Sequence, residues 1–256
     1  MKKLLLVAVV AAFASCSSDE AIVEVETIST FPKGKLKKMQ NVIHLELVHT
    51  SPDGITRTPY DAFVNYDYTY GQHNFVTKED EYSIHYNGID VETKKSIEYV
   101  YKDGKVTDKK YFSNGNLTNN YTYTYTNNLI TREESGIKIT NFIYNTNNEV
   151  VREEIFTRGE TKPRAIYDFT YESGNVVSIS LTMNNTTTKE LFKYDDKNNS
   201  NKDMYPEALL KILRVSKNNP INDSFREYSF EYNSDEYPIK RSAKDNYSDT
   251  TFEYFK

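Results

Sequence analysis

The sequence predicts an all-β protein, an antiparallel meander of hairpin repeats that forms a strongly curved sheet or an open β-barrel. From about residue 40 onward one unit recurs: an aromatic residue, any residue, Tyr, a polar turn, and then a β-branched residue or Leu. The rings alternate with other residues, which is the period of a β-strand. The composition agrees, because 22 Tyr accompany only 9 Gly and 7 Pro, which fits neither a disordered nor a collagen-like chain.

The turn residues predict one hairpin for each copy of the unit. Asp103-Gly104 and Asn127-Asn128 tolerate the positive φ angles of tight hairpin turns. A meander of about sixteen short strands curls because strand twist accumulates, and near closure removes exposed edges. The copies of aromatic-x-Tyr occupy residues 68–70, 99–101, 123–125, 142–144, 169–171, 192–194, 230–232 and 252–254.

Residues 40–256 are expected to form a single β-rich domain. A domain of this size hides about 70 to 75% of its unfolded surface, so it needs no disulfide to fold. The exception to the strand pattern is the segment 205–213, where Pro206 suits a first helical turn and Ala208-Leu209-Leu210 follows. We expect one short helix there that plugs one end of the sheet; a partner-binding helix is the alternative.

The N-terminus predicts export. Lys2 and Lys3 precede an apolar run over residues 4–14, which is the anatomy of a secretory signal and is too short for a permanent transmembrane helix. Residues 1–15 are therefore expected to be a signal peptide, and residues 16–39 a lipid anchor and tether. No other segment approaches the roughly 18 to 20 apolar residues that a transmembrane helix needs.

Cys16, the single cysteine of the chain, is the expected site of lipidation. It follows Phe13-Ala14-Ser15, a segment that resembles the lipobox of bacterial lipoproteins, with Phe13 where Leu is more usual. An odd cysteine in an exported chain needs an explanation, and acylation supplies one. Two acyl signals give a stable anchor where a single chain is marginal. An unpaired exported thiol is the alternative.

These features predict an outer-membrane lipoprotein whose membrane partner is reached through the lipid anchor. Residues 17–20 resemble the short acidic stretch after the lipidated cysteine of surface-exposed lipoproteins from Bacteroidetes-type bacteria, which implies a place on the cell surface. The formal net charge is −5. Because nucleic-acid-binding proteins concentrate positive charge on one face, no nucleic-acid partner is expected.

The repeating unit carries two family resemblances. It is similar to the YD repeat of Rhs-type shells, although the regular glycines of that family are missing. The C-terminal two thirds resemble a family of Bacteroides lipoproteins whose domain has a porin-like β fold. That resemblance implies a fold and a location but no activity. The residues that carry it are 194–199, Asn218-Asn219-Pro220, 230–233 with Tyr237-Pro238, and Phe252-x-Tyr254.

No pattern predicts catalysis or a cofactor. The G-x-S-x-G, G-x-G-x-x-G and phosphate-loop patterns are missing, and without a cysteine beyond Cys16 a thiolate zinc site is excluded. The four histidines, His44, His49, His73 and His85, show neither the i, i+2 nor the i, i+4 spacing of common metal sites. We interpret them as exposed or strand-edge residues. The expectation is a protein that is not an enzyme and that holds no cofactor.

One acidic loop partly matches a calcium site. Asp196, Asn198, Ser200 and Glu207 approach the oxygen-ligand spacing of a calcium loop. Against this reading, a strand and not a helix precedes the loop, Pro206 adjoins the last ligand, and two nearby lysines oppose a cation. A solvated Asn-rich turn is the preferred interpretation, so no metal site is expected.

Clustered carboxylates raise the alternative of an exported glycan-active hydrolase. Glycoside hydrolysis needs two carboxyl groups about 5 to 9.5 Å apart. The clusters are residues 79–81, 133–134 and 153–154. Adjacent residues of a strand point to opposite faces, so these clusters suit surface charge better than catalysis.

The Tyr residues leave two interpretations, an aromatic core or an aromatic concave face. Rings beside Asn and Asp are typical of carbohydrate-binding surfaces, although Trp, the usual strongest platform, is absent. The candidate ligand-facing rings are Tyr101, Tyr125, Tyr144 and Tyr171. We therefore expect a non-catalytic surface protein that is structural or that binds a glycan, another small ligand or another envelope protein.

Overall fold

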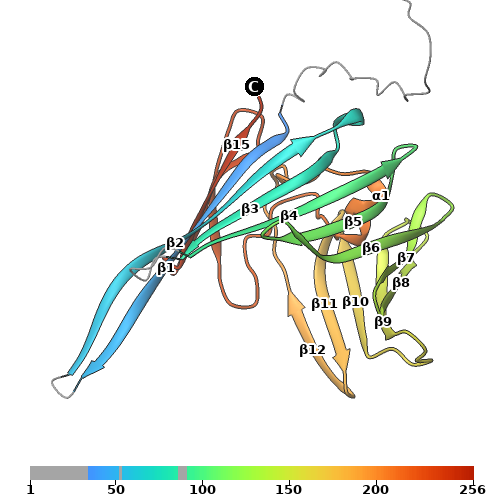
Figure 1. The fold of residues 1–256 in the computed structure, drawn as a ribbon, viewed down its shortest axis with the longest axis horizontal. Helices are drawn as coiled ribbons and strands as arrows, with labels where there is room; N and C mark the ends of the chain where they lie inside the picture. Colours follow the sequence, from blue (N-terminus) through green and yellow to red (C-terminus); the bar gives the residue numbers. More distant parts are fainter. Residues whose placement is uncertain (1–33, 52–53, 86–90) are drawn as a thin grey trace, which may run out of the picture. The chain divides into compact units, whose positions relative to one another are not determined.

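The computed structural model contains one antiparallel sheet of 15 strands in meander order (Figure 1). It describes residues 34–51, 54–85 and 91–256. Strands β1 to β12 lie side by side in chain order, and β15 pairs with β1 and continues to β14 and β13. The sheet is not closed by strand pairing, since β12 and β13 are its two edges. The expected all-β fold, with a curved open sheet and one short helix, is confirmed.

The strands lengthen towards the N-terminus. The long β1–β2 hairpin extends past its neighbours, because β1 pairs with β15 only as far as Ile43 and β2 pairs with β3 only from Phe63 (Figure 1). The strands are β1 (Leu36–Ser51), β2 (Gly54–Tyr70), β3 (Val76–His85), β4 (Val91–Lys102), β5 (Lys105–Ser113), β6 (Asn116–Thr126), β7 (Leu129–Ser135), β8 (Lys138–Tyr144), β9 (Val150–Thr157), β10 (Ala165–Glu172), β11 (Asn175–Met183), β12 (Thr186–Leu191), β13 (Tyr228–Tyr232), β14 (Pro238–Ala243) and β15 (Ser248–Tyr254).

A β-bulge sits beside the Tyr of most aromatic-x-Tyr units. On β4 and β5, Val100 pairs with Asp108 but Tyr101 pairs with Val106, so Thr107 is left over. Bulges bend a strand and increase its twist, which gives this sheet its curvature. The residues left over in the equivalent positions are Thr77, Thr107, Thr131, Val151, Val177 and Ile239.

The second ring of the unit binds the backbone of the neighbouring strand. The Tyr101 hydroxyl on β4 donates to the carbonyl of Val76 on β3 at 2.6 Å, and Val76 is fully buried. Each such bond gives a backbone carbonyl a hydrogen-bond donor and holds the tyrosine ring over a buried residue. The aromatic-x-Tyr unit therefore contributes its rings to the core. Equivalent bonds are Tyr70–Leu36, Tyr125–Val106, Tyr144–Ile130, Tyr194–Val176 and Tyr254–Pro238.

The segment between β12 and β13 covers the core and bridges the two sheet edges. Helix α1 (Glu207–Ile212) follows Pro206 and buries Leu209 and Ile212, in agreement with the helix expected at 205–213. Further on, Ile221 donates its N–H to the Lys193 carbonyl at 2.9 Å and accepts from the Tyr228 N–H at 2.8 Å. The connection thus joins the ends of β12 and β13.

The first strand starts earlier than the expected domain boundary at residue 40. Leu36 is fully buried and pairs with Tyr254 of β15, so the β structure extends into the range 16–39 assigned to the anchor and tether. A partner at the far end of the chain is not visible in the local sequence. The signal peptide at 1–15 and Cys16 lie outside the described residues. Among the described residues, no helix has the length and apolar character to cross a membrane.

Candidate binding site

The four rings expected to face a ligand pack against the core. Tyr101, Tyr125, Tyr144 and Tyr171 are half-buried beside the central hydrophobic cluster. Three of their hydroxyls donate to backbone carbonyls, as described above. None of the four lines the groove described below. Their position is that of rings that replace aliphatic core residues.

The four candidate calcium ligands each have a partner within the protein. Asn198 Oδ1 accepts a hydrogen bond from Lys202 Nζ at 2.8 Å, and the Glu207 carboxylate pairs with Lys211 Nζ at 2.8 Å. The other two contacts are Asp196–Lys197 at 3.6 Å and Ser200–Asn201 at 3.3 Å. Within the part of the chain that the structure describes, no group of three His, Cys, Asp or Glu side chains is placed to hold a metal ion.

At least one carboxylate of each acidic cluster lies on the inner face of the sheet. Glu79, Glu133 and Glu153 stand directly opposite rings of the core, and directly opposite residues of an antiparallel pair share a face. The surface interpretation is therefore wrong for these three. The reason is the strand period, which turns one member of any adjacent pair inward. The opposing rings are Tyr68, Tyr123 and Phe142.

Two of these carboxylates fasten the segment around α1. Glu79 accepts hydrogen bonds from the hydroxyl of Tyr99, at 2.6 Å, and from that of Tyr205. Buried Glu153 accepts one from the Arg214 guanidinium. Burial raises the pKa of Glu153 although Arg214 opposes the shift, and burial together with the charge of Glu79 raises the pKa of both tyrosines. The inner polar groups therefore hold α1 on the sheet.

The third inner carboxylate faces a buried lysine. Lys109 Nζ lies 3.9 Å from Glu133 Oε2 and 4.8 Å and 5.2 Å from the ring centroids of Tyr121 and Tyr111. Stacking on two rings and pairing with one carboxylate compensate the desolvation cost of burying the ammonium group. With Glu79 and Glu153, this makes a row of charged side chains whose partners come from the protein itself.

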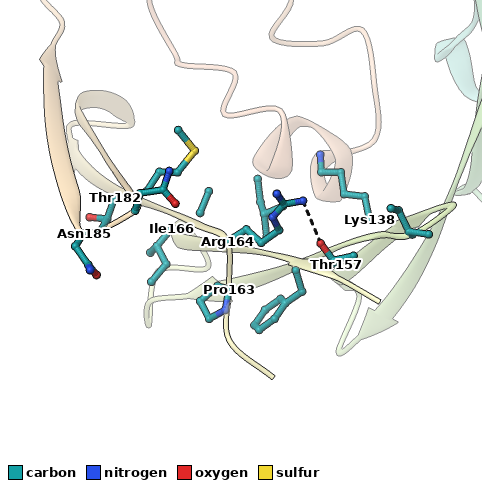
Figure 2. Close-up of a pocket in the computed structure, with 13 residues that line it drawn as sticks. Lys138, Thr157, Pro163, Arg164, Ile166, Thr182 and Asn185 are labelled. Atoms are coloured by element: carbon teal, nitrogen blue, oxygen red, sulfur yellow. Dashed lines mark hydrogen bonds between the residues drawn. The ribbon is translucent and has the colours of Figure 1, made fainter. Parts of the chain in front are cut away.

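A groove of about 710 Å³ opens beside the β9–β10 loop (Figure 2). Its borders are the β7–β8 turn, the facing ends of β9 and β10, and the β11–β12 turn. The apolar lining is formed by Ile137, Ile155, Phe156, Pro163, Ala165, Ile166 and Met183, and the polar lining by Lys138, Thr157, Arg164, Thr182, Asn184 and Asn185.

Two cations, Arg164 and Lys138, line the groove from opposite walls. Arg164 is fixed at both ends, since its N–H donates to the Ile155 carbonyl at 2.7 Å and its Nη1 to Thr157 Oγ1 at 3.3 Å (Figure 2). Lys138 follows the β7–β8 turn at the opposite wall. Across the described ranges, neither side chain forms an ion pair. Burial raises the pKa of the Glu153 carboxyl group, whereas the charge of Lys138 lowers it. The groove therefore offers an apolar wall and the cations Arg164 and Lys138 to one ligand.

Sequence reasoning missed this groove because turns and strand ends from four strands build it. Ile137 and Met183 are large apolar residues next to Gly136 and Asn184, at positions where turns are usually polar. The apolar residues at the turn tips are the signal that the sequence offers. That they line one groove can be inferred only from the register of β8 to β12.

The comparisons with known proteins show the fold alone. No protein-family model matches the chain, and no curated protein matches it. Among solved structures, a porin-like protein from Bacteroides uniformis is similar with a TM-score of 0.58 at 11% sequence identity. The likeness covers 88% of this chain and 100% of that chain. It agrees with the porin-like β fold that the sequence resemblance implied.

Proposed function

We propose that this chain is a lipid-anchored, non-catalytic envelope protein that binds an amphiphile with an anionic group. The signal-like residues 1–15 and the lipobox-like segment before Cys16 support the outer-membrane anchor. The porin-like fold of the Bacteroides uniformis protein supports an envelope location and a relation to Bacteroides lipoproteins of porin-like fold. The groove supports the binding role.

The chemistry of the groove carries the proposed ligand class. Its walls are mostly aliphatic, with Phe156 as the one ring, so the apolar part of a ligand packs on them. Arg164 and Lys138 offer charge-assisted hydrogen bonds to a carboxylate or phosphate, which are about twice as strong as neutral ones. An amphiphile satisfies both sides, whereas a glycan needs ring platforms that this groove does not provide.

The absence of catalysis is part of the proposal. Glu79, Glu133 and Glu153 on the inner face each have a partner within the protein. Tyr99 and Tyr205 donate hydrogen bonds to Glu79, Lys109 lies near Glu133, and Arg214 pairs with Glu153. The hydrolase alternative requires two free carboxyl groups facing one cavity, and the groove lining contains no carboxylate.

The anchor is tested by mass spectrometry on the protein isolated from membranes. We expect acyl chains on Cys16 and loss of the Cys16→Ala protein from the membrane fraction. A Cys16→Ala protein recovered unchanged with the membranes would contradict the anchor.

The ligand class is tested by isothermal titration with decanoate and with uncharged decanol. We expect decanoate to bind more tightly, and Arg164→Ala to weaken it by about 10- to 100-fold, as for the loss of one charged hydrogen bond. Arg152→Ala is the matched control, since Arg152 pairs with Asp168 outside the groove. Equal affinity for the two compounds, or binding on a glycan array without decanoate binding, would contradict the proposal.

A further inference from the structure

Several exposed large apolar side chains lie at one end of the sheet. In an antiparallel meander the β5–β6, β7–β8, β9–β10 and β11–β12 connections all lie at the same end. At these connections Leu117 is 56% exposed, Ile137 68% and Met183 49%. Exposed apolar groups that gather in one region mark an interaction surface.

Phe225 belongs to the same end. Its ring is 87% exposed, in the loop that leads into β13. Strand β13 starts there, because Tyr228 pairs with Ala243, next to the β14–β15 turn. The N–H of Ser224 donates to Glu190 Oε1 of β12 at 3.0 Å, which places the loop beside the edge strand.

Two hollows lie between these connections. A hollow of about 480 Å³ joins Leu117 to Gly136 and Arg158, and the 710 Å³ groove continues from Ile137 to Met183 (Figure 2). We call this region the turn surface. It consists of Leu117, Ile137, Met183 and Phe225 with the charged residues Glu134, Lys138, Arg158, Glu160, Lys162 and Arg164.

The turn surface has an excess of positive charge in a chain whose net charge is −5. Its cations are Lys138, Arg158, Lys162 and Arg164. Its acids are Glu134, which pairs with Arg158 at 2.6 Å, and Glu160, which accepts from the Thr157 N–H at 3.4 Å, so the four cations exceed the acids by two. Opposite charge therefore favours an anionic partner.

We infer that the turn surface docks on an anionic lipid bilayer. Leu117 and Phe225 project from separate connections, and only Ile137 and Met183 share the wall of the groove. Single side chains can enter the boundary between head groups and acyl chains, while nearby cations attract anionic head groups. A rigid protein partner instead needs a continuous complementary patch. The inference rests on the proposed function for the groove ligand and identifies membrane lipid as its source.

The test uses spin labels on the full chain, with its anchor, reconstituted in vesicles. Cys16 is the only native cysteine, so Leu117→Cys and Ile137→Cys each add one labelling site. Ile143→Cys is the matched control, because Ile143 is 42% exposed on β8 near the β8–β9 connection, at the opposite end of the sheet. Power saturation then measures collisions with oxygen and with a water-soluble nickel chelate.

In vesicles of phosphatidylglycerol and phosphatidylcholine, we expect labels at 117 and 137 to lose collisions with the nickel chelate and to gain collisions with oxygen, while the label at 143 stays in water. Equal nickel accessibility at all three positions would overturn the docking. Equal immersion in pure phosphatidylcholine would overturn the choice of anionic lipid. Failure of the protein to float with either vesicle would refute the anchor instead, which separates the two proposals.

Discussion

The hydroxyl of Tyr144 on β8 donates to the backbone carbonyl of Ile130 on β7 at 2.6 Å. Ile130 is fully buried, and the skipped residue Val151 forms the bulge beside the tyrosine on the following strand. One ring thus ties together a core residue, a bulged hairpin and the neighbouring strand. Because the arrangement recurs along the sheet, it explains why a chain poor in aliphatic residues is rich in Tyr.

The hydroxyl bond predicts a measurable loss of stability in Tyr144→Phe. Removing the hydroxyl leaves a buried carbonyl unpaired, so we expect the free energy of unfolding to fall by about 1 to 2 kcal/mol in urea denaturation. Tyr167→Phe is the control, since the Tyr167 ring stacks on Phe169 and its hydroxyl bonds no other described residue. Equal losses in the two variants would contradict a specific role for the bond.

The Arg214–Glu153 pair predicts a larger effect. Arg214→Ala leaves a buried carboxylate without its cation, which costs about 3 kcal/mol or more. Arg152→Ala removes a pair in which both side chains are 43% exposed, so less than about 1 kcal/mol is expected. The comparison is made by urea unfolding of both variants. A loss for Arg214→Ala as small as for Arg152→Ala would show that the pair does not hold the α1 segment.

Glu153 also predicts a pH dependence of stability. Burial raises its pKa in the folded state. A carboxyl group with a raised pKa contributes stability below its unfolded pKa, and this contribution is lost as pH rises through the folded pKa. The unmodified chain should therefore lose stability relative to Glu153→Gln as pH rises from about 4 towards neutrality. The measurement is the difference between their urea unfolding free energies over that range, and a constant difference would refute the raised pKa.

Local sequence patterns predicted the elements of this fold but not their long-range partners. Alternation and turn residues identified the hairpins, and Pro206 with the following aliphatic residues identified α1. Leu36 was assigned to the tether because its partner Tyr254 lies at the other end of the chain.

The inner charges and the groove needed the register. Strand alternation turns one residue of each acidic pair towards the inner face. The partners that compensate the burial of Glu79 and Glu153, however, are Tyr205 and Arg214, which come from the distant α1 segment. Similarly, Ile137 and Arg164 are 27 positions apart in the sequence, and they line the same groove only because β8 pairs with β9. Local pattern therefore predicts strands, whereas sites between strand ends depend on register.

Ligand binding in the groove can be followed directly at the methionine side chains. Met183 lines the groove, whereas Met204 is buried in the core and Met39 lies in a different hollow. In a protein labelled with ¹³C at the methionine methyl groups, decanoate is titrated and the spectrum followed by NMR. We predict that the Met183 resonance shifts while those of Met39 and Met204 stay in place. Saturating decanoate with an unmoved Met183 resonance, or a shift at Met39 instead, would contradict the account.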